Sequence, residues 1–260
     1  MQWGKAKTVL IAVLLAVNIF LFLVTQQSVR SRSRLDEEYI DNAISLLSTR
    51  GVFIREEDFS SSKLLLSTAT ISTKEMLYPF ARALLEDQTL EPSVEGDGVW
   101  FRGEKGSVLL SGAADFSFEA EQPPKDLAEV GELLQMAGFS QEEFVEQDGR
   151  LVQTLFDVPM YGCEVSLKNG VVTGRLLVTA KAVQKNDELI DAANALLAFS
   201  AWLEEPSLAA HTVEQVTPIY LVETAGLFNT ATCTPGYRVQ TGEGACLINA
   251  VTGEVQSEES

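Results

Sequence analysis

Ser60-Ser61-Ser62-Lys63 fits the S-x-x-K pattern, in which a lysine amine lies beside a serine hydroxyl that acts as a nucleophile. Enzymes with this pattern also carry a K-T-G strand and an S-D-N-like loop, and this sequence contains neither. It also lacks a G-x-S-x-G elbow, a G-x-x-x-x-G-K-S/T phosphate loop and a G-x-G-x-x-G turn after a strand. We therefore interpret the four residues as a polar loop before a strand.

Acid–base chemistry would have to come from the single histidine or from the acidic residues. His211 lies in SLAAHTVEQ without an activated nucleophile, and we interpret it as a loop histidine. With 37 acidic residues, some carboxylate pair falls at a glycosidase-like separation by chance. The carboxylates considered for such a pair are Asp115, Glu119, Glu146 and Asp157. None stands above this background, so we assign no catalytic residue.

The three cysteines, Cys163, Cys233 and Cys246, form no C-x-x-C pair. Odd and sparse usage argues against a disulfide framework, and one histidine with scattered cysteines has no zinc-binding spacing. A single bridge between Cys233 and Cys246 is one alternative, and we favour three ordinary thiols in strands. We expect no metal ion and no cofactor.

An uninterrupted apolar run extends from Thr8 to Thr25. At ~1.5 Å per helical residue it spans roughly 27 Å, close to a hydrocarbon core of about 30 Å. A cleaved signal usually has a shorter run and an A-x-A-like site, whereas an arginine-rich segment follows here. The sequence therefore predicts an uncleaved anchor, and its basic residues on both sides leave the orientation open. The expected segments are a stub over 1–7, a transmembrane helix over 8–27 and a basic juxtamembrane linker over 28–34.

Three residues of this run are candidates for helix–helix contact within the membrane. Ala12 and Ala16 form a small-x-x-x-small pair, which lets two helices approach closely. Asn18 needs a hydrogen-bond partner in hydrocarbon, and a neighbouring helix could supply it. The alternative is that two alanines and one asparagine are ordinary residues of a single span. We assign the three as candidate partner-binding residues.

The charge of the chain bears on its partners. The sequence has 19 basic and 37 acidic residues, and its first 34 residues hold five basic and no acidic ones. The remainder therefore carries a net charge of −23. Such a surface repels nucleic acid, and no basic stripe interleaved with aromatic residues offsets it. We expect no nucleic-acid binding.

Periodicity predicts the elements of the first half. LDEEYIDNAISLLSTRG is an amphipathic helix capped by Gly51, and KLLLSTATIS is a strand. A helix is expected around Glu75–Glu86, with Pro79 near its first turn. VWFRGEKGSVLLSG predicts a hairpin that turns from Gly103 to Gly106. AEQPPKD, which ends at Asp126, is the best linker.

The second half has a clearer rhythm. A helix with apolar residues from Leu127 to Ala137 ends at Gly138, and a longer one is expected over about Asp187–Leu203. The first precedes strands LVQTLFDVPMYG, CEVSLK and VVTGRLLVTA, the last two joined by Asn169-Gly170. The second precedes strands EQVTPIYLVETA, GYRVQ and ACLINAVTGEV.

Helix followed by three antiparallel strands thus occurs twice, at about 126–180 and 187–256. The sequence predicts the α+β class, with a single N-terminal transmembrane helix and then helices packed on antiparallel sheets. The expected domains are an N-terminal unit over 35–122, a C-terminal region over 125–256 made of the two repeated plans, and a disordered tail over 257–260.

The chain resembles the YycI-type members of the YycH/YycI family of Gram-positive membrane proteins. The resemblance rests on the opening MQWGKAKTVLIAVLLAVNIFLF and on ELIDAANALL, PIYLVETAGLF, PGYRVQ and CLINAVTGEV near the other end. FDVPMYGCEVSLKNGVV resembles the strand-hairpin unit of peptidase-propeptide, or PepSY-like, modules. Gln2 stands where the family usually has an acidic residue, and the match is poorest over about 52–122.

The resemblance implies a cytoplasmic stub, one span in the cell membrane and an extracytoplasmic domain. It also implies a non-enzymatic regulator of an essential two-component sensor histidine kinase involved in signal transduction. The transmembrane helix would contact the kinase and a YycH-like partner protein, as a homo- or hetero-dimer. The alternative function is a propeptide-like extracytoplasmic module that binds or inhibits a cell-wall hydrolase or holds a wall-derived ligand.

Overall fold

The computed structural model describes residues 39–55, 67–72, 77–112, 114–179, 182–185, 188–203, 211–224 and 230–258. Within these ranges no helix combines the length and the apolarity that crossing a membrane requires. The predicted span, with Ala12, Ala16 and Asn18, lies outside the described residues. The Ser60–Lys63 segment lies outside them too.

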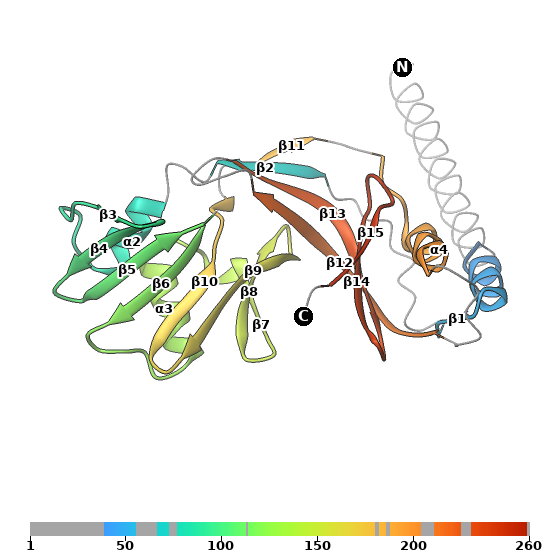
Figure 1. The fold of residues 1–260 in the computed structure, drawn as a ribbon, viewed down its shortest axis with the longest axis horizontal. Coiled ribbons are helices and arrows are strands. Elements are labelled where there is room, and N and C mark those ends of the chain that lie inside the picture. The colour runs from blue at the N-terminus through green and yellow to red at the C-terminus, as the bar shows by residue number, and fades with distance from the viewer. Residues whose placement is uncertain are drawn as a thin grey trace, which may run out of the picture.

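The described residues form two lobes joined by a long β-hairpin (Figure 1). The first lobe contains α2 (Leu77–Leu84), β3 (Ser93–Glu95), β4 (Gly98–Gly103), β5 (Gly106–Ser111), β6 (Asp115–Ala120), α3 (Leu127–Met136), η2 (Gln141–Glu143), β7 (Phe144–Gln147), β8 (Arg150–Leu155), β9 (Val158–Lys168) and β10 (Val171–Arg175). The second lobe contains a helix over 39–49, β1 (Val52–Phe53), α4 (Ala192–Trp202), β14 (Gly244–Asn249) and β15 (Val255–Ser257). The joining hairpin is β12 (His211–Thr224) with β13 (Thr230–Thr241), and β2 (Thr68–Ser72) and β11 (Val183–Lys185) lie along its far end.

Capping side chains set the helix ends. Asp126 accepts a hydrogen bond from the Glu129 backbone N–H at 3.0 Å and starts α3, and Gly138 follows its end with φ +100°. Asp191 caps α4 in the same way through the Asn194 N–H at 2.8 Å. The helix that was expected from about Asp187 therefore begins at Ala192, because the N-cap residue Asp191 has extended, non-helical backbone angles.

The strands form one sheet whose main path runs β11-β2-β13-β12-β9-β10-β6-β5-β4-β3. Hairpin turns at Gly103–Gly106 and Asn169-Gly170 confirm the predicted pairings of β4 with β5 and of β9 with β10. The pairing of β12 with β9 is parallel, through Tyr220–Met160 and Leu221–Tyr161, although all pairings were expected to be antiparallel. Parallel neighbours need a long crossover, which here passes through β10, β11 and α4. The fold belongs to the α+β class, as predicted.

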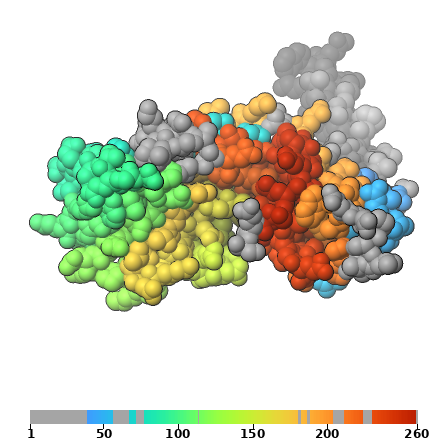
Figure 2. Space-filling model, viewed as in Figure 1, coloured from blue at the N-terminus to red at the C-terminus, as the bar shows by residue number. Residues whose placement is uncertain are grey.

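Two hydrophobic cores lie at opposite ends of the joining hairpin. The first packs α2 and α3 against the sheet of the first lobe and includes Tyr220 and Cys233 from the far end of the hairpin. The second packs α4 and the helix over 39–49 against Val216, Tyr237 and Val239 of the hairpin. The hairpin therefore belongs to both cores, and the space-filling view shows the two lobes side by side (Figure 2).

The predicted linker does not separate two cores. Residues 121–126 form the loop between β6 and α3. Phe116 and Phe118 before this loop and Val130 and Leu134 after it share the first core. The division of the described core residues thus follows the two ends of the hairpin and not the position of the prolines.

Three local predictions are corrected. LVQTLFDVPMYG is two strands, because Phe156 and Asp157 both have positive φ (52° and 63°) and turn the chain between β8 and β9. His211 begins strand β12, where its backbone N–H donates to the Gly51 carbonyl at 2.9 Å, and is not a loop residue. The tail is ordered through Glu258, since Ser257 ends β15 and the Glu258 backbone N–H donates to Ala245.

Candidate functional site

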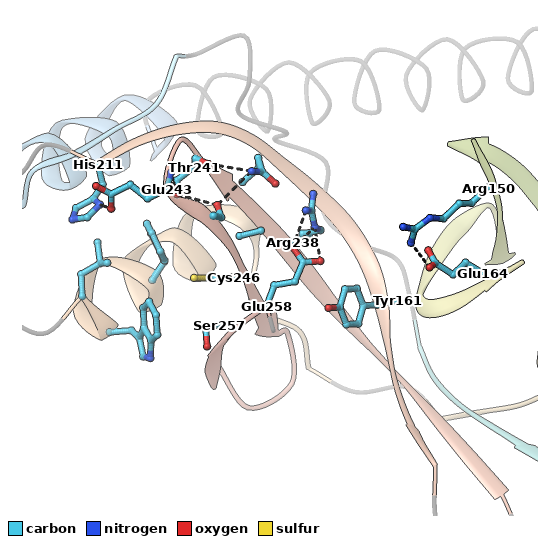
Figure 3. A pocket seen from close by; sticks show the side chains of 16 residues that line it. Arg150, Tyr161, Glu164, His211, Arg238, Thr241, Glu243, Cys246, Ser257 and Glu258 are labelled. Atoms are coloured by element: carbon cyan, nitrogen blue, oxygen red, sulfur yellow. Dashed lines mark hydrogen bonds and ion pairs between the residues drawn. The ribbon is translucent and has the colours of Figure 1, made fainter. Parts of the chain in front are cut away.

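A hollow lies between the two lobes, and we call it the inter-lobe hollow. It consists of two adjoining cavities of about 770 and 480 Å³. Both cavities are lined by five shared residues: Arg150, Tyr161, Glu164, Arg238 and Glu258. Arg150, Tyr161 and Glu164 come from the β8–β9 hairpin of the first lobe, and the other two come from the second-lobe sheet (Figure 3).

Strand alternation places Arg238 in this hollow. Its neighbours Tyr237 and Val239 face the second core, so Arg238 and Gln240 project from the opposite face of β13. Ile219, Leu221 and Leu247 form a small apolar cluster on that face, with Tyr161 packed against it. The smaller cavity of the hollow is therefore floored by the face of the sheet that does not carry α4.

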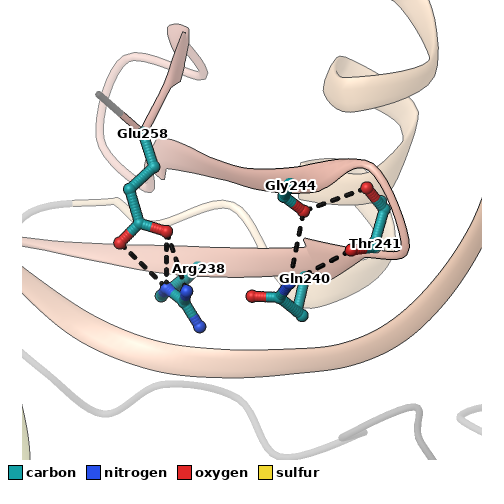
Figure 4. A network of polar contacts seen from close by, with 5 residues as sticks. All are labelled: Arg238, Gln240, Thr241, Gly244 and Glu258. Atoms are coloured by element: carbon teal, nitrogen blue, oxygen red, sulfur yellow. Dashed lines mark hydrogen bonds and ion pairs between the residues drawn. The ribbon is translucent and has the colours of Figure 1, made fainter. Parts of the chain in front are cut away.

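Arg238 and Glu258 form the central ion pair. Arg238 Nε lies 3.0 and 3.1 Å from the two Glu258 carboxylate oxygens, and Nη2 lies 2.8 Å from Oε2 (Figure 4). The hydrogen bonds to Glu258 raise the pKa of Arg238 above its ordinary value, against the desolvation that lowers it. The side chains are 32% and 22% exposed, so the pair is half-buried and still open to the hollow.

Tyr161 connects this ion pair to the first lobe. Burial raises the pKa of Tyr161, and the negative charge of Glu258 adds to the rise. Beside it, Arg150 of β8 forms an ion pair with Glu164 of β9. The hollow thus holds two arginine–glutamate pairs on facing walls, with a tyrosine hydroxyl between the lobes.

A bulge in β9 brings Tyr161 to this position. The register of β8 with β9 shifts from Val152–Glu164 to Thr154–Pro159, and Gly162 within the shift has φ +76°. Over this stretch β9 turns from β8 and pairs with β12. A bulge re-aims side chains in this manner, and here it directs Tyr161 across the gap between the lobes.

The other end of the hollow lies at the turn between β13 and β14. Gln240 Nε2 donates to the Thr241 carbonyl at 3.0 Å, and the Thr241 hydroxyl donates to the Gly244 carbonyl at 3.0 Å. His211 Nδ1 lies 3.4 Å from a Glu243 carboxylate oxygen, across the same turn. Trp202 of α4 lines this end of the hollow, and its ring stacks on the ring of Phe199 in the same helix.

One edge of β12 faces the smaller cavity. On the side away from β13, β12 pairs with β1 at His211 and Thr212 and with β9 at Tyr220 and Leu221. Between these pairings, no described strand lies against that edge. The Gln215, Thr217 and Ile219 side chains line the cavity there. The hollow therefore offers amide and hydroxyl groups beside an open strand edge.

The thiols are unsuited to nucleophilic chemistry. All three cysteines are free, as favoured from the sequence, and the alternative Cys233–Cys246 bridge is not formed; the structure adds that all three are buried. Burial raises the pKa of both Cys163 and Cys233 to about 12 and also raises that of Cys246, which lines the hollow. A thiol held protonated is a poor nucleophile. Among the described residues, no three His, Cys, Asp or Glu side chains are grouped as a metal site would require.

The four carboxylates considered from the sequence lie outside the inter-lobe hollow. Asp115 is held by Arg175, whose Nε lies 2.8 Å from its Oδ1. Asp115 and Glu119 stand four residues apart on β6, about 13 Å along a strand, which exceeds the carboxylate spacing of a glycosidase. Glu146 lies on β7 and Asp157 in the β8–β9 turn.

Of the residues considered from the sequence that the structure describes, His211 and Cys246 line the hollow. Sequence reasoning missed the ion pair at its centre. Arg238 lay in a predicted strand, and Glu258, 20 positions further along the chain, lay in a tail expected to be disordered. The only signal in the sequence was the alternation of apolar and polar residues in GYRVQ, which places Arg238 on the opposite strand face from Tyr237 and Val239.

No family model matches the sequence, and no curated protein matches it. An uncharacterized protein from Eubacterium rectale, known from a crystal structure, is similar over 80% of this chain and 90% of its own. The two are 11% identical in sequence, and the TM-score is 0.44.

Proposed function

We propose that this chain is a non-enzymatic, membrane-anchored regulator of a two-component sensor histidine kinase, of the type that YycI represents. One observation carries the proposal: the helix over 39–49, which follows the predicted juxtamembrane linker, shares a core with the same sheet that lines the hollow. A ligand or partner domain bound on one side can then alter the position of the helix on the other.

The contacts of the helix over 39–49 are extensive. Ala43 and Leu47 are buried in the second core with α4. Tyr39 donates its hydroxyl to Asp191 Oδ1 at 3.3 Å and accepts from Asn194 Nδ2 at 3.1 Å. Arg50, just after the helix, reaches the Ser200 hydroxyl at 3.3 Å. Side chains at both ends of the helix therefore attach it to α4.

Strand β1, which follows this helix directly, pairs with the joining hairpin. Val52 and Phe53 of β1 pair in parallel with His211 and Thr212 of β12. α4 packs on one face of this sheet, and the smaller cavity of the hollow lies on the other, whereas the larger cavity extends to the end of α4 at Trp202 and Leu203. Occupation of the hollow would favour one arrangement of the two lobes over another. Such a difference in binding free energy is what couples two sites.

In this function the predicted span, with Ala12, Ala16 and Asn18, contacts the kinase helices within the membrane. The residues after it lie outside the cytoplasm and receive a partner ectodomain or a ligand. Paired arginine and glutamate side chains, amides and buried thiols support binding and not turnover. The proposal includes a YycH-like partner protein as a second subunit.

The test is a transcriptional reporter of kinase output in the native host, with the full chain and two leucine variants. Leu47 is fully buried and Leu46 is 44% exposed on the same helix, so Leu47→Gln and Leu46→Gln are matched. We expect Leu47→Gln to change the output to that of a deletion strain, and Leu46→Gln to behave as the parent.

Two further measurements decide the result. Replacing Thr8–Thr25 by an unrelated apolar helix is expected to abolish regulation while the protein stays in the membrane. Crosslinking from the full chain is expected to recover a sensor kinase. Unchanged output in the deletion strain, or recovery of secreted hydrolases alone, would refute the kinase function and favour the propeptide-like alternative.

A further inference from the structure

The carboxylate that neutralises Arg238 comes from a lightly held segment. Glu258 follows β15, a strand of only three residues. Its backbone N–H donates to the Ala245 carbonyl at 2.9 Å, and its side chain reaches into the hollow to Arg238 (Figure 4). Few contacts therefore need to break for this carboxylate to leave Arg238.

The surroundings of Arg238 suit a peptide. Gln215 offers an amide, Gln240 offers its amide oxygen, Thr217 and Tyr161 offer hydroxyls, and beside them runs the edge of β12 that no strand of the described residues covers. Amide side chains and strand edges are the groups that recognise peptide backbone in an extended conformation. A carboxylate with a single negative charge is favoured over a phosphate, which carries about −1.5 to −2, because Glu164 and Glu243 also line the hollow and the chain after residue 34 has a net charge of −23.

We propose that Arg238 is the carboxylate subsite of a peptide-binding hollow and that Glu258 occupies this subsite until the carboxyl terminus of a peptide displaces it. Exchange of one carboxylate for another keeps the half-buried guanidinium paired, whereas a neutral ligand would leave it without an anion. The released Glu258 side chain is hydrated in solvent. The ligand class is thus an extended peptide with a free carboxyl end.

Displacement has a consequence across the lobes. Tyr161 of the first lobe and Glu258 of the second line the same two cavities, and the negative charge of Glu258 raises the pKa of Tyr161. When Glu258 leaves Arg238, a charge beside Tyr161 moves away, so ligand binding is linked to the relative position of the lobes. The inference deepens the proposed function by naming a ligand class for the hollow, and it rests on that function only for its effect on a kinase.

The experiment is isothermal titration of the purified full chain in detergent with N-acetyl-Ala-Ala-Ala and with its carboxyl-terminal amide. We expect the acid to bind and the amide to bind at least roughly tenfold more weakly. Glu258→Gln is expected to tighten binding of the acid severalfold, because the apparent affinity rises as the competent fraction of sites rises. Arg238→Gln is expected to abolish it, and Arg238→Lys to weaken it.

The chain offers a matched control in the exposed pair Arg102–Glu95, which is also bidentate, with distances of 2.6 and 2.8 Å. Glu95→Gln is expected to leave the affinity unchanged. Melting temperatures of all variants are compared with the parent, and Arg238→Lys serves if Arg238→Gln does not fold.

Three outcomes of the titrations with the tripeptide would overturn the inference. They are equal binding of acid and amide, no binding of the acid even to Glu258→Gln, and unchanged affinity in that variant. Acetate that binds at the same concentrations as the tripeptide acid would also overturn the inference, because the site would then recognise a carboxylate without recognising a peptide. The titration contains no kinase, so its failure is separate from a failure of the reporter assay.

Discussion

Gln153 is a buried side chain that replaces a missing strand partner, and its removal makes a quantitative test of the first lobe. It is fully buried in β8. Its Oε1 accepts from the Leu177 backbone N–H at 2.9 Å, and its Nε2 donates to the Leu177 carbonyl. Leu177 follows β10, where the chain leaves the first lobe for β11. One side chain therefore satisfies both backbone groups of a buried residue.

Gln153→Leu keeps the volume and removes both hydrogen bonds. Each buried backbone group left without a partner costs about 1–3 kcal/mol, so we expect the free energy of unfolding to fall by roughly 2–5 kcal/mol. The assay is urea denaturation of the full chain, followed by the fluorescence of Trp100 in β4 of the same lobe.

The control is Gln147→Leu, at an exposed position of β7, which is expected to change the free energy by less than about 0.5 kcal/mol. A loss below about 1 kcal/mol in Gln153→Leu would refute the reasoning. It would mean that the Leu177 N–H and carbonyl find other partners once the glutamine is gone.

Three further predictions concern a helix cap, the thiols and two glycines. Asp191→Ala removes the α4 cap and the contact with Tyr39 and is expected to cost about 1–2 kcal/mol in thermal denaturation, with Asp191→Asn retaining most of the stability. Unfolded thiols ionise near pH 9.0, whereas Cys163 and Cys233 stay protonated until about 12. The free energy of unfolding should therefore fall as the pH rises through this window, and it should fall less steeply in Cys163→Ala. Mass spectrometry should find both thiols unalkylated by iodoacetamide at pH 8 until urea is added. Gly236→Ala would place Cβ 2.5 Å from the Ile248 carbonyl oxygen and is expected to lower the free energy of unfolding by about 1–3 kcal/mol. Gly131→Ala in α3, where the new Cβ has nothing within 4 Å, is expected to raise it by about 0.5–1 kcal/mol. Urea denaturation measures both.

The short-range features of the fold could be predicted because their causes lie within a few residues. Asn169 and Gly170 have positive φ (53° and 79°) and turn β9 into β10, as an Asn-Gly pair in a hairpin predicts. Gly51 and Gly138 end their helices with positive φ. The turn at Phe156-Asp157 was missed, because it has the same geometry without the residue types that usually signal it.

The inter-lobe hollow could not be predicted in the same way. Its walls exist because β9 pairs in parallel with β12, some 60 residues further along the chain, and the sequence of neither strand specifies the other as its partner. The Arg238–Glu258 pair and the contact from Tyr161 depend on that pairing and on the bulge in β9. His211 reached the hollow only because β12 starts beside β1.

The amino-acid sequence by itself determined the α+β class, several caps and turns, the free state of the thiols and the acidity of the chain. These follow from backbone preferences and apolar periodicity, which act over one or two turns of chain. Only the tertiary structure decided which strands lie side by side, which residues share a core and which charges meet. Those choices depend on the total apolar surface that each arrangement buries, and this is a property of the whole chain.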